Sequence, residues 1–150
     1  MTKERSLVLI KPDGMIKNLH GTVLTELSKL DIKMIGLKLV NVEKELAERH
    51  YEEHRGKPFL EKLIKHLTGE LHENENVIAI CYQGENATTK IREVIGSTNP
   101  YKAHPTTIRG RFGRINPEND CFENVVHASD SKESGEREVS IWFNNEELIK

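Results

Sequence analysis

The sequence predicts an α+β protein with a ferredoxin-like βαββαβ fold, in which a four-stranded antiparallel sheet carries helices packed on one face. Two observations predict it. Four apolar or alternating segments typical of strands are separated by segments with helical spacing of apolar residues, and their order gives β-α-β twice. The 150 residues match the size of one domain, so we expect a single domain over residues 1–150. A doubly wound parallel sheet is the competing topology, but it would need about five or more regular strands and four are visible.

Each predicted strand rests on a short apolar or alternating run. The first run is almost continuously apolar and ends at the turn signal Lys11–Gly14, because the proline in it cannot serve a central strand ladder. The second run alternates apolar and polar residues, as a half-buried strand does. The predicted strands are Ser6–Ile10, Ile32–Val42, Val77–Tyr82 and Asn124–His127.

Each predicted helix rests on apolar spacing or on signals at its ends. Gly96 and Pro100 stop one helix, and Asp130 with Glu133 resembles a capping box that opens the last one. Tyr101–Glu123 has no sustained periodicity, and such a long irregular stretch usually indicates function or disorder. The predicted helices are His20–Leu30, Lys44–His54, Pro58–Leu67, Asn86–Ile95 and a last one from about Asp130 to Phe143.

Composition limits the classes of function. Lys and Arg number 22 and Asp and Glu number 24, so the net charge of -2 gives no strong global field toward nucleic acid or anionic lipid. The apolar runs are far shorter than the roughly 20 residues of a spanning helix, so we expect no membrane protein. Met1–Arg5 leads into a run too short for a signal peptide, so we expect the cytoplasm. Cys81 and Cys121 give neither a disulfide framework nor a Cys-rich metal site.

The usual glycine-rich phosphate cradles are missing. The sequence has no G-x-x-x-x-G-K-[ST] motif, and no G-x-G-x-x-G opens a helix after the first strand. A bound nucleotide must then be held by side chains, among which arginine offers a planar fork and lysine a point charge for phosphate. Each candidate alone is more simply a solvated surface residue, and only their convergence would form a phosphate site. The candidates are Lys11, Arg92, Thr98 and Arg109.

His127 is the most informative of the seven histidines, because it ends an apolar strand and stands just before a helix start. The free N–H groups of a helix N-terminus stabilise an anion there, and neutral imidazole is a competent nucleophile near physiological pH. Glu138 lies on that helix and could accept the other N–H of the ring, which would fix its tautomer. A satisfied structural role remains the commoner one for a lone histidine, and the serines that follow suit a simple N-cap.

Two other patterns give alternatives. His50–His54 matches H-x-x-E-H, the inverted zinc-peptidase signature, but no feature nominates the third ligand that a catalytic zinc needs. Arg109–Arg114 interleaves three arginines with two glycines and an aromatic residue, which could bind RNA. A nucleic-acid module usually has a broader basic stripe, whereas this chain has a pI near 6.4. The cluster fits better as a local phosphate site for a small ligand.

Six blocks of sequence together resemble the nucleoside diphosphate kinase family. The resemblance covers about residues 5–143, and the order of the blocks makes it highly specific. The blocks are Leu9–Gly14, His50–Tyr51 with His54–Phe59, Gly84–Ala87, Thr98–Pro100, Thr107–Gly110 and Asn124–Ser131.

The resemblance implies transfer of the terminal phosphate from a nucleoside triphosphate such as ATP to a nucleoside diphosphate, by a ping-pong route through a phosphohistidine at His127. It implies that Phe59 stacks on the base, that Arg92 and Thr98 hold the middle phosphate, and that Arg109 holds the terminal one. Asn124 would contact the ribose. The catalytic set that it implies is His127, Glu138, Ser129, Lys11 and Tyr51, in which Lys11 contacts both ribose and transferring phosphate, Tyr51 sits beside the nucleophile, and Ser129 and Glu138 orient it.

The resemblance also implies partners. Mg²⁺ would bridge the phosphates of the nucleotide itself, so no metal-binding residues are expected on the protein. A homo-oligomer is expected, a hexamer first and a tetramer second, and nucleic acid is not expected as a partner. Several positions depart from the usual family pattern: Ala128 replaces Gly, Glu123 replaces Arg, Arg111 replaces Asp, and Glu70–Asn76 and Pro117–Phe122 are longer.

Overall fold

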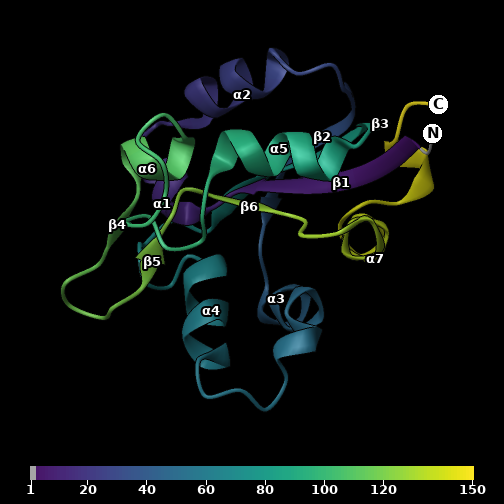
Figure 1. Cartoon of the computed structure of the whole chain (residues 1–150). Coiled ribbons are helices and arrows are strands. Elements are labelled where there is room, and N and C mark those ends of the chain that lie inside the picture. Colours follow the sequence, from purple (N-terminus) through teal and green to yellow (C-terminus); the bar gives the residue numbers. More distant parts are fainter. Residues whose placement is uncertain (1–2) are drawn as a thin grey trace.

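A four-stranded sheet forms the centre of the computed structural model, which describes residues 3–150 (Figure 1). The strand order is β2-β3-β1-β6, and every neighbouring pair is antiparallel. This order is that of the ferredoxin-like fold, so the predicted α+β class is confirmed. Met1 and Thr2, which begin the segment inspected for a signal peptide, lie outside the described residues. The strands are β1 (Lys3–Ile10), β2 (Lys33–Asn41), β3 (Asn76–Glu85) and β6 (Val126–Ala128).

Helices cover both faces of this sheet, so the expectation that they lie on one face is wrong. Leu7 and Leu9 of β1 are fully buried on one face, and Val8 and Ile10 are fully buried on the other. A strand that is covered on both sides has a continuous apolar sequence, which is the pattern that β1 shows. The first face packs against α3 (Lys44–His50), α4 (Leu60–Leu67) and α7 (Lys132–Trp142), and the second against α2 (His20–Ser28) and α5 (Ala87–Ile95).

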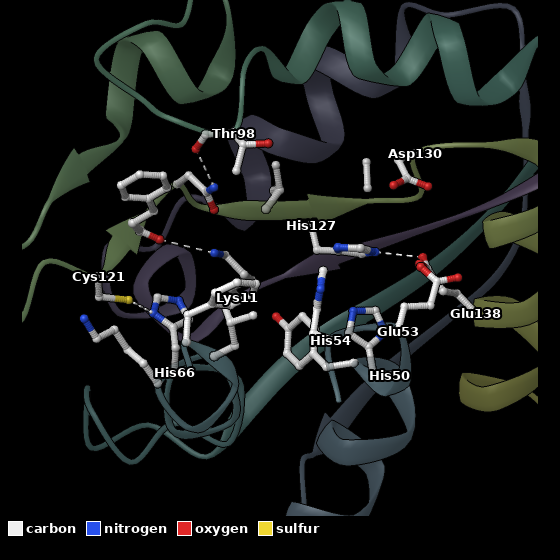
Figure 2. A pocket seen from close by; sticks show the side chains of 18 of the residues that line it. Lys11, His50, Glu53, His54, His66, Thr98, Cys121, His127, Asp130 and Glu138 are labelled. Carbon is white, nitrogen blue, oxygen red and sulfur yellow. Dashed lines mark hydrogen bonds and ion pairs between the residues drawn. The ribbon is translucent and has the colours of Figure 1, made fainter. Parts of the chain in front are cut away.

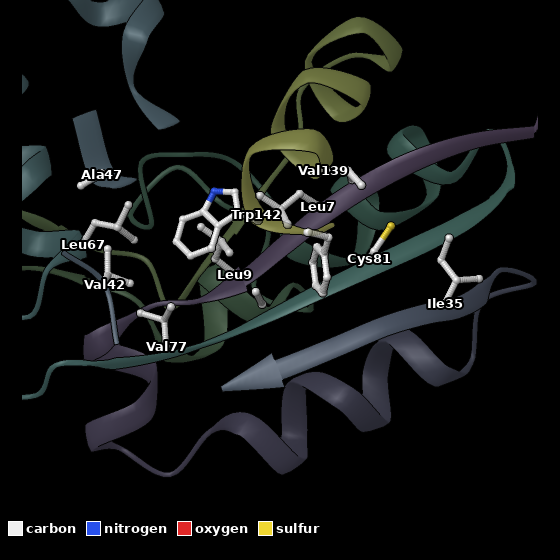
Figure 3. Packing of buried hydrophobic residues seen from close by; sticks show 12 residues of the cluster. Leu7, Leu9, Ile35, Val42, Ala47, Leu67, Val77, Cys81, Val139 and Trp142 are labelled. Carbon is white, nitrogen blue, oxygen red and sulfur yellow. The ribbon is translucent and has the colours of Figure 1, made fainter. Parts of the chain in front are cut away.

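Figure 3 shows the core on the first face, where Trp142 of α7 lies over Leu7 and Leu9 of β1. Trp142 is only 3% exposed, and its large ring joins the end of α7 to the sheet. Within residues 3–150, no helix has both the length and the apolar character needed to cross a membrane.

Several predicted boundaries shift. The turn signal after β1 begins a short helix, α1 (Pro12–Ile16), because proline is well tolerated in a first helical turn. The predicted helix Lys44–His54 divides into α3 and a 3-10 helix, η1 (Glu52–His54). The irregular stretch before β6 contains one short helix and a small hairpin. These are α6 (Ile108–Phe112), β4 (Arg114–Ile115) and β5 (Phe122–Glu123), and a 3-10 turn, η2 (Asn145–Glu147), follows α7.

The last strand of the sheet begins later than predicted because of Val125. This residue has a φ of 72°, a left-handed conformation that is strained for a β-branched side chain. Two hydrogen bonds hold it: its N–H donates to Asp13 Oδ2 at 2.8 Å, and its carbonyl accepts from the Lys11 N–H at 2.9 Å. Val125, two residues before His127, therefore fixes the chain just before β6 starts.

Close packing of α7 on β1 gives a testable prediction. A Cβ added at Gly135 would lie 2.1 Å from the backbone oxygen of Arg5, so the helix and the strand must separate to admit one. We expect Gly135→Ala to lower the free energy of unfolding in urea by about 1–3 kcal/mol. The matched control is Gly21→Ala in α2, where nothing lies within 4 Å and alanine should stabilise the helix by roughly 0.5–1 kcal/mol. Equal effects of the two substitutions would contradict the packing argument.

Candidate active site

A cavity of about 560 Å³ lies beside the end of β1 and the adjacent strand β6 (Figure 2). Residues that lie far apart in the sequence meet in it, because β1 and β6 are neighbours in the sheet and the α3–α4 segment faces them. Every site residue predicted from the sequence lines this cavity except Ser129, which is fully buried. The lining residues from that set are Lys11, Tyr51, Phe59, Arg92, Thr98, Arg109, Asn124, His127 and Glu138.

His127 is oriented by Glu138. The ring Nε2 lies 2.8 Å from Glu138 Oε1, and the Ser129 hydroxyl donates to the same oxygen at 2.8 Å. A carboxylate only accepts hydrogen bonds, so His127 carries its proton on Nε2 and keeps a free lone pair on Nδ1. The side chain of His127 is 21% exposed and that of Glu138 is 7% exposed. The site therefore holds a partly accessible imidazole with one nitrogen available for chemistry.

Ser129 joins this pair to the sheet. Its hydroxyl accepts from the Leu7 N–H at 3.0 Å while it donates to Glu138. Its own N–H donates to the Leu7 carbonyl at 3.0 Å, which continues the contact between β1 and the chain beyond β6. The orientation of His127 thus depends on β1, the segment after β6 and α7 together.

Three cations converge on the cavity, and none of them forms an ion pair with a carboxylate within residues 3–150. Arg109 is 5% exposed and donates to the carbonyls of Gly96 at 3.0 Å and Val126 at 2.7 Å. Lys11 Nζ donates to the Phe122 carbonyl at 3.4 Å, and Arg92 donates to the Ala128 carbonyl at 3.4 Å. Burial lowers the pKa of Arg109 to about 10 and lowers the pKa of Lys11. Two buried cations and one partly exposed cation without an ion pair among the described residues indicate that the ligand of this cavity is an anion.

The remaining predicted residues lie at the mouth and along the wall of the cavity. Phe59 stands just before α4 and is 44% exposed, so its ring is free to stack on a ligand. Asn124 donates to the Thr98 carbonyl at 2.8 Å, which leaves its own side-chain oxygen without a partner among the described residues. Tyr51 follows α3, and burial raises the pKa of its hydroxyl. An aromatic mouth and a cationic interior suit a nucleotide.

The two alternative patterns lose their structural basis. His50 ends α3 and His54 lies in η1, so the two histidines do not share consecutive turns of one α-helix as a zinc signature requires. The arginine cluster separates: Arg109 is buried in the cavity, Arg111 lies 3.8 Å from Glu26, and Arg114 donates to Glu123 at 3.2 Å. These three guanidinium groups do not form one basic surface for nucleic acid.

Sequence reasoning missed two contributors to the site. Asp13 was interpreted as part of a turn, but its buried carboxylate holds both Val125 and His66. His50 belongs to one of the blocks that carry the resemblance and to the alternative zinc pattern, but its contact with His127 is not predicted: the two rings pack edge-on with centroids 4.5 Å apart. Asp13 stands two residues after Lys11 and His50 stands directly before Tyr51, and this closeness to candidate site residues is the signal in the sequence that could have indicated them.

Comparison with known proteins decides the family. Residues 4–148 match the family model described as nucleoside diphosphate kinase. The chain belongs to the nucleoside diphosphate kinase family. The predicted resemblance and enzyme class are therefore confirmed.

Relatives of this kinase family match nearly the whole chain. A nucleoside diphosphate kinase of Pyrococcus furiosus is 43% identical over 98% of this chain and 87% of its own. One of Sulfurisphaera tokodaii is 42% identical over 99% of this chain and 95% of its own. The solved kinase of Borrelia burgdorferi, a transition-state mimic with bound vanadate and ADP, superposes with a TM-score of 0.88 at 28% identity, covering 99% of this chain and 91% of that one.

The two segments expected to be longer than in the family each contact a residue that lies close in sequence to the other segment. His72, in the longer loop after α4, lies 3.6 Å from the buried Glu123 carboxylate. Cys121, in the other longer segment, lies with its Sγ 2.7 Å from His66 Nδ1. Ala128 is buried, and its carbonyl accepts from Arg92. The departures are thus accommodated by side-chain contacts of this chain.

The buried His66–Asp13 pair gives a pH prediction. Their nitrogen and oxygen atoms are 2.9 Å apart. Burial lowers the pKa of His66 from 6.5 to about 4, so the unfolded chain binds a proton more readily than the folded one. Stability from this group is present above about pH 6.5 and is lost as the pH falls toward about 4. We expect urea unfolding to show a loss of roughly 1–3 kcal/mol over this interval.

The matched control for this prediction uses an exposed histidine. His66→Asn removes the titrating group and should flatten the acid slope, although buried His50, whose pKa is also lowered by burial, keeps part of it. His104→Asn changes a histidine on the surface and should leave the slope as it is. A wild-type slope in His66→Asn would contradict the assignment.

Proposed function

We propose that this chain transfers the terminal phosphate of a nucleoside triphosphate such as ATP to a nucleoside diphosphate through a phosphohistidine at His127. The observation that carries the proposal is the pairing of His127 Nε2 with Glu138 at 2.8 Å beside three cations that lack a carboxylate partner within residues 3–150. A nucleophile with a fixed lone pair and a cationic cavity are the two parts that phosphoryl transfer needs.

The proposed phosphoryl transfer has two steps, one onto His127 and one from it. The Nδ1 lone pair of His127 attacks the terminal phosphorus, the bond to the bridging oxygen breaks, and the nucleoside diphosphate leaves with that electron pair. A second nucleoside diphosphate then attacks the phosphorus through its terminal oxygen, and Nδ1 leaves with its lone pair restored. The ring gains positive charge in the first step, and Glu138 stabilises it through the Nε2–H bond.

The nucleotide contacts follow the positions of the cavity residues. We infer that Phe59 stacks on the base, which any base permits because each has a π-face. Lys11 and Asn124 contact the ribose, and Lys11 also reaches the transferring phosphate. The middle phosphate lies between Arg92 and Thr98, and the terminal phosphate lies against Arg109. Tyr51 forms the wall beside His127. The ADP and vanadate in the Borrelia burgdorferi structure support a nucleotide in this fold.

Mg²⁺ is the proposed cofactor, held by the phosphates of the nucleotide. The donor set of the cavity fits this arrangement, since its buried interior presents cations and one oriented carboxylate, whereas Mg²⁺ prefers several oxygen ligands. When bound, Mg²⁺ neutralises phosphate charge. The protein side chains, Lys11, Arg92 and Arg109, orient the same phosphates.

Label transfer tests the nucleophile. We expect the wild-type protein, incubated with γ-labelled ATP, to form an acid-labile labelled protein that loses its label to GDP. His127→Asn should abolish both steps, because an amide cannot form the covalent intermediate. His54→Asn, which changes another histidine of the cavity, is the matched control and should still form labelled protein. Transfer by His127→Asn, or label retained by another residue, would end the proposal.

A homo-oligomer in the cytoplasm is proposed, a hexamer first and a tetramer second. Strand β2 supports self-association because it lies at the sheet edge and exposes Leu37 at 50% and Leu39 at 63%. Light scattering on the purified protein should give a mass near six times the 17.2 kDa of one chain. Leu39→Lys should lower that mass, because it places a charge on the exposed edge. A monomeric wild-type protein would contradict the proposed oligomer but would leave the proposed phosphohistidine mechanism unaffected.

A further inference from the structure

His50 is buried against the proposed nucleophile but makes none of the contacts assigned to substrate. It is 3% exposed, and its ring meets His127 edge-on at a centroid distance of 4.5 Å and an interplanar angle of 81°. Figure 2 shows His50 beside His127, with Glu138 next to both. One ring nitrogen of His50, one of His127 and a carboxylate oxygen of Glu138 all lie within 4.8 Å of one another.

Trp142 determines where the proton of His50 lies. The indole Nε1–H donates to His50 Nδ1 at 3.0 Å, a bond between α7 and α3 that spans 92 residues of sequence. An indole N–H only donates, so His50 Nδ1 must accept and must remain without a proton. The neutral ring therefore carries its proton on Nε2. An imidazolium would place a second N–H against the indole N–H, and two donors would then face each other.

We propose that Trp142 locks His50 as the neutral Nε2–H tautomer, and that this makes His50 a positioning residue for the phosphorylation of His127. The inference rests on the proposed role of His127 as the nucleophile. With His50 unable to take a proton, His127 is the ring of this pair that acquires charge. Glu138 then accepts from His127 and Ser129 without competition from a cationic neighbour.

The charged groups around His50 also disfavour its protonation. His127 faces it from β6, and Arg137 faces it from α7, the helix that also carries Glu138. His54 of η1 and Lys11 after β1 lie on the other sides, and Tyr51 packs against the ring at 4.7 Å. Burial first and the neighbouring positive groups second lower the pKa of His50 well below its usual value. Glu138 would favour the cation, but its Oε1 already accepts from His127 and Ser129.

The lock also affects metal binding. Two histidines and a carboxylate this close resemble a transition-metal site. A metal on His50 Nε2 would, however, move the ring proton to Nδ1, where it would oppose the indole N–H at 3.0 Å. The Trp142 bond therefore disfavours Zn²⁺ beside His127 as well as protonation. Removing the indole N–H should relieve both restrictions.

Nitrogen NMR of the wild-type protein tests the lock directly. We expect the His50 ring to show a bare Nδ1 and a protonated Nε2 from about pH 5.5 to about pH 8.5, with no titration between. In Trp142→Phe no donor faces Nδ1, so both neutral tautomers should be populated and the pKa of the still-buried ring should rise toward the acid end of this range. A wild-type His50 with a proton on Nδ1 overturns the proposal. This readout needs no activity, so it stands apart from a failure of the wild-type protein to form phosphoenzyme, which would instead end the proposed function.

Rates of phosphoenzyme formation test the consequence for His127. We expect Trp142→Phe to raise the rate ratio between about pH 8.5 and about pH 6 roughly tenfold over wild type, because a second group now takes a proton. His50→Gln offers an oxygen to Trp142 and an N–H in place of Nε2–H, and should keep the wild-type ratio. Phe143→Leu removes a buried aromatic from the same core and serves as the packing control.

Zinc titration gives a third readout. We expect Trp142→Phe, without nucleotide, to bind Zn²⁺ at least about tenfold more tightly than wild type by calorimetry. A merely structural role for Trp142 would lower stability and activity at every pH and leave the rate ratio and zinc affinity as in wild type. That result, or the same change of ratio in Phe143→Leu, would overturn the proposal.

Discussion

One carboxylate oxygen fixes the position of His127 relative to β1 and α7. Oε1 of Glu138 accepts from His127 on β6 and from Ser129 just after it, and Ser129 in turn is bonded twice to Leu7 of β1. If α7 moved away from β1, the imidazole would lose the partner that fixes its tautomer. The close contact between Gly135 and Arg5 sets that separation, so a packing distance between helix and strand determines which ring nitrogen faces the cavity.

The cations of the cavity differ from the His127–Glu138–Ser129 group, because no carboxylate within residues 3–150 neutralises their charge. Arg109 is nearly buried, and its two partners are carbonyl oxygens, which orient a guanidinium without neutralising it. Lys11 and Arg92 are held in the same way. The protein thus keeps positive charge on buried and partly buried side chains at a cost to its stability, and binding of a polyanionic ligand would offset that cost. The same logic explains the strained Val125, since its conformation lets Asp13 anchor the start of β6 close to Lys11.

Much of this could be predicted from sequence because the signals were local. Continuous apolar character identified β1, and the position of His127 between a strand and a helix start made it a candidate nucleophile before any resemblance was considered. The relation of Glu138 to His127 followed from their place on either side of one helix start. The two-sided cover of the sheet is equally local in β1, but it was missed because periodicity alone does not say how many layers surround a strand.

Other features could not be predicted from the sequence because they depend on contacts between distant segments. His50 and Trp142 lie 92 residues apart, and nothing in either neighbourhood indicates the other. The H-x-x-E-H spacing instead suggested a zinc site, since a sequence pattern cannot show that α3 ends at its first histidine. The divided helix and the left-handed Val125 are likewise outcomes of tertiary packing that overrides local preference.

A buried histidine beside the proposed nucleophile needs a physical reason, because a second titratable ring there could compete with His127 for a proton. An apolar ring at His50 would leave the Trp142 N–H without an acceptor in a core where it is 3% exposed. An acid at that position would attract the Nε2–H of His127 away from Glu138, and a lysine would add a charge beside Lys11 and Arg137. A neutral imidazole with a fixed proton satisfies the indole, adds no charge and leaves Glu138 to His127. The tryptophan makes this choice stable, because it converts a pH-sensitive side chain into one whose protonation is determined by geometry.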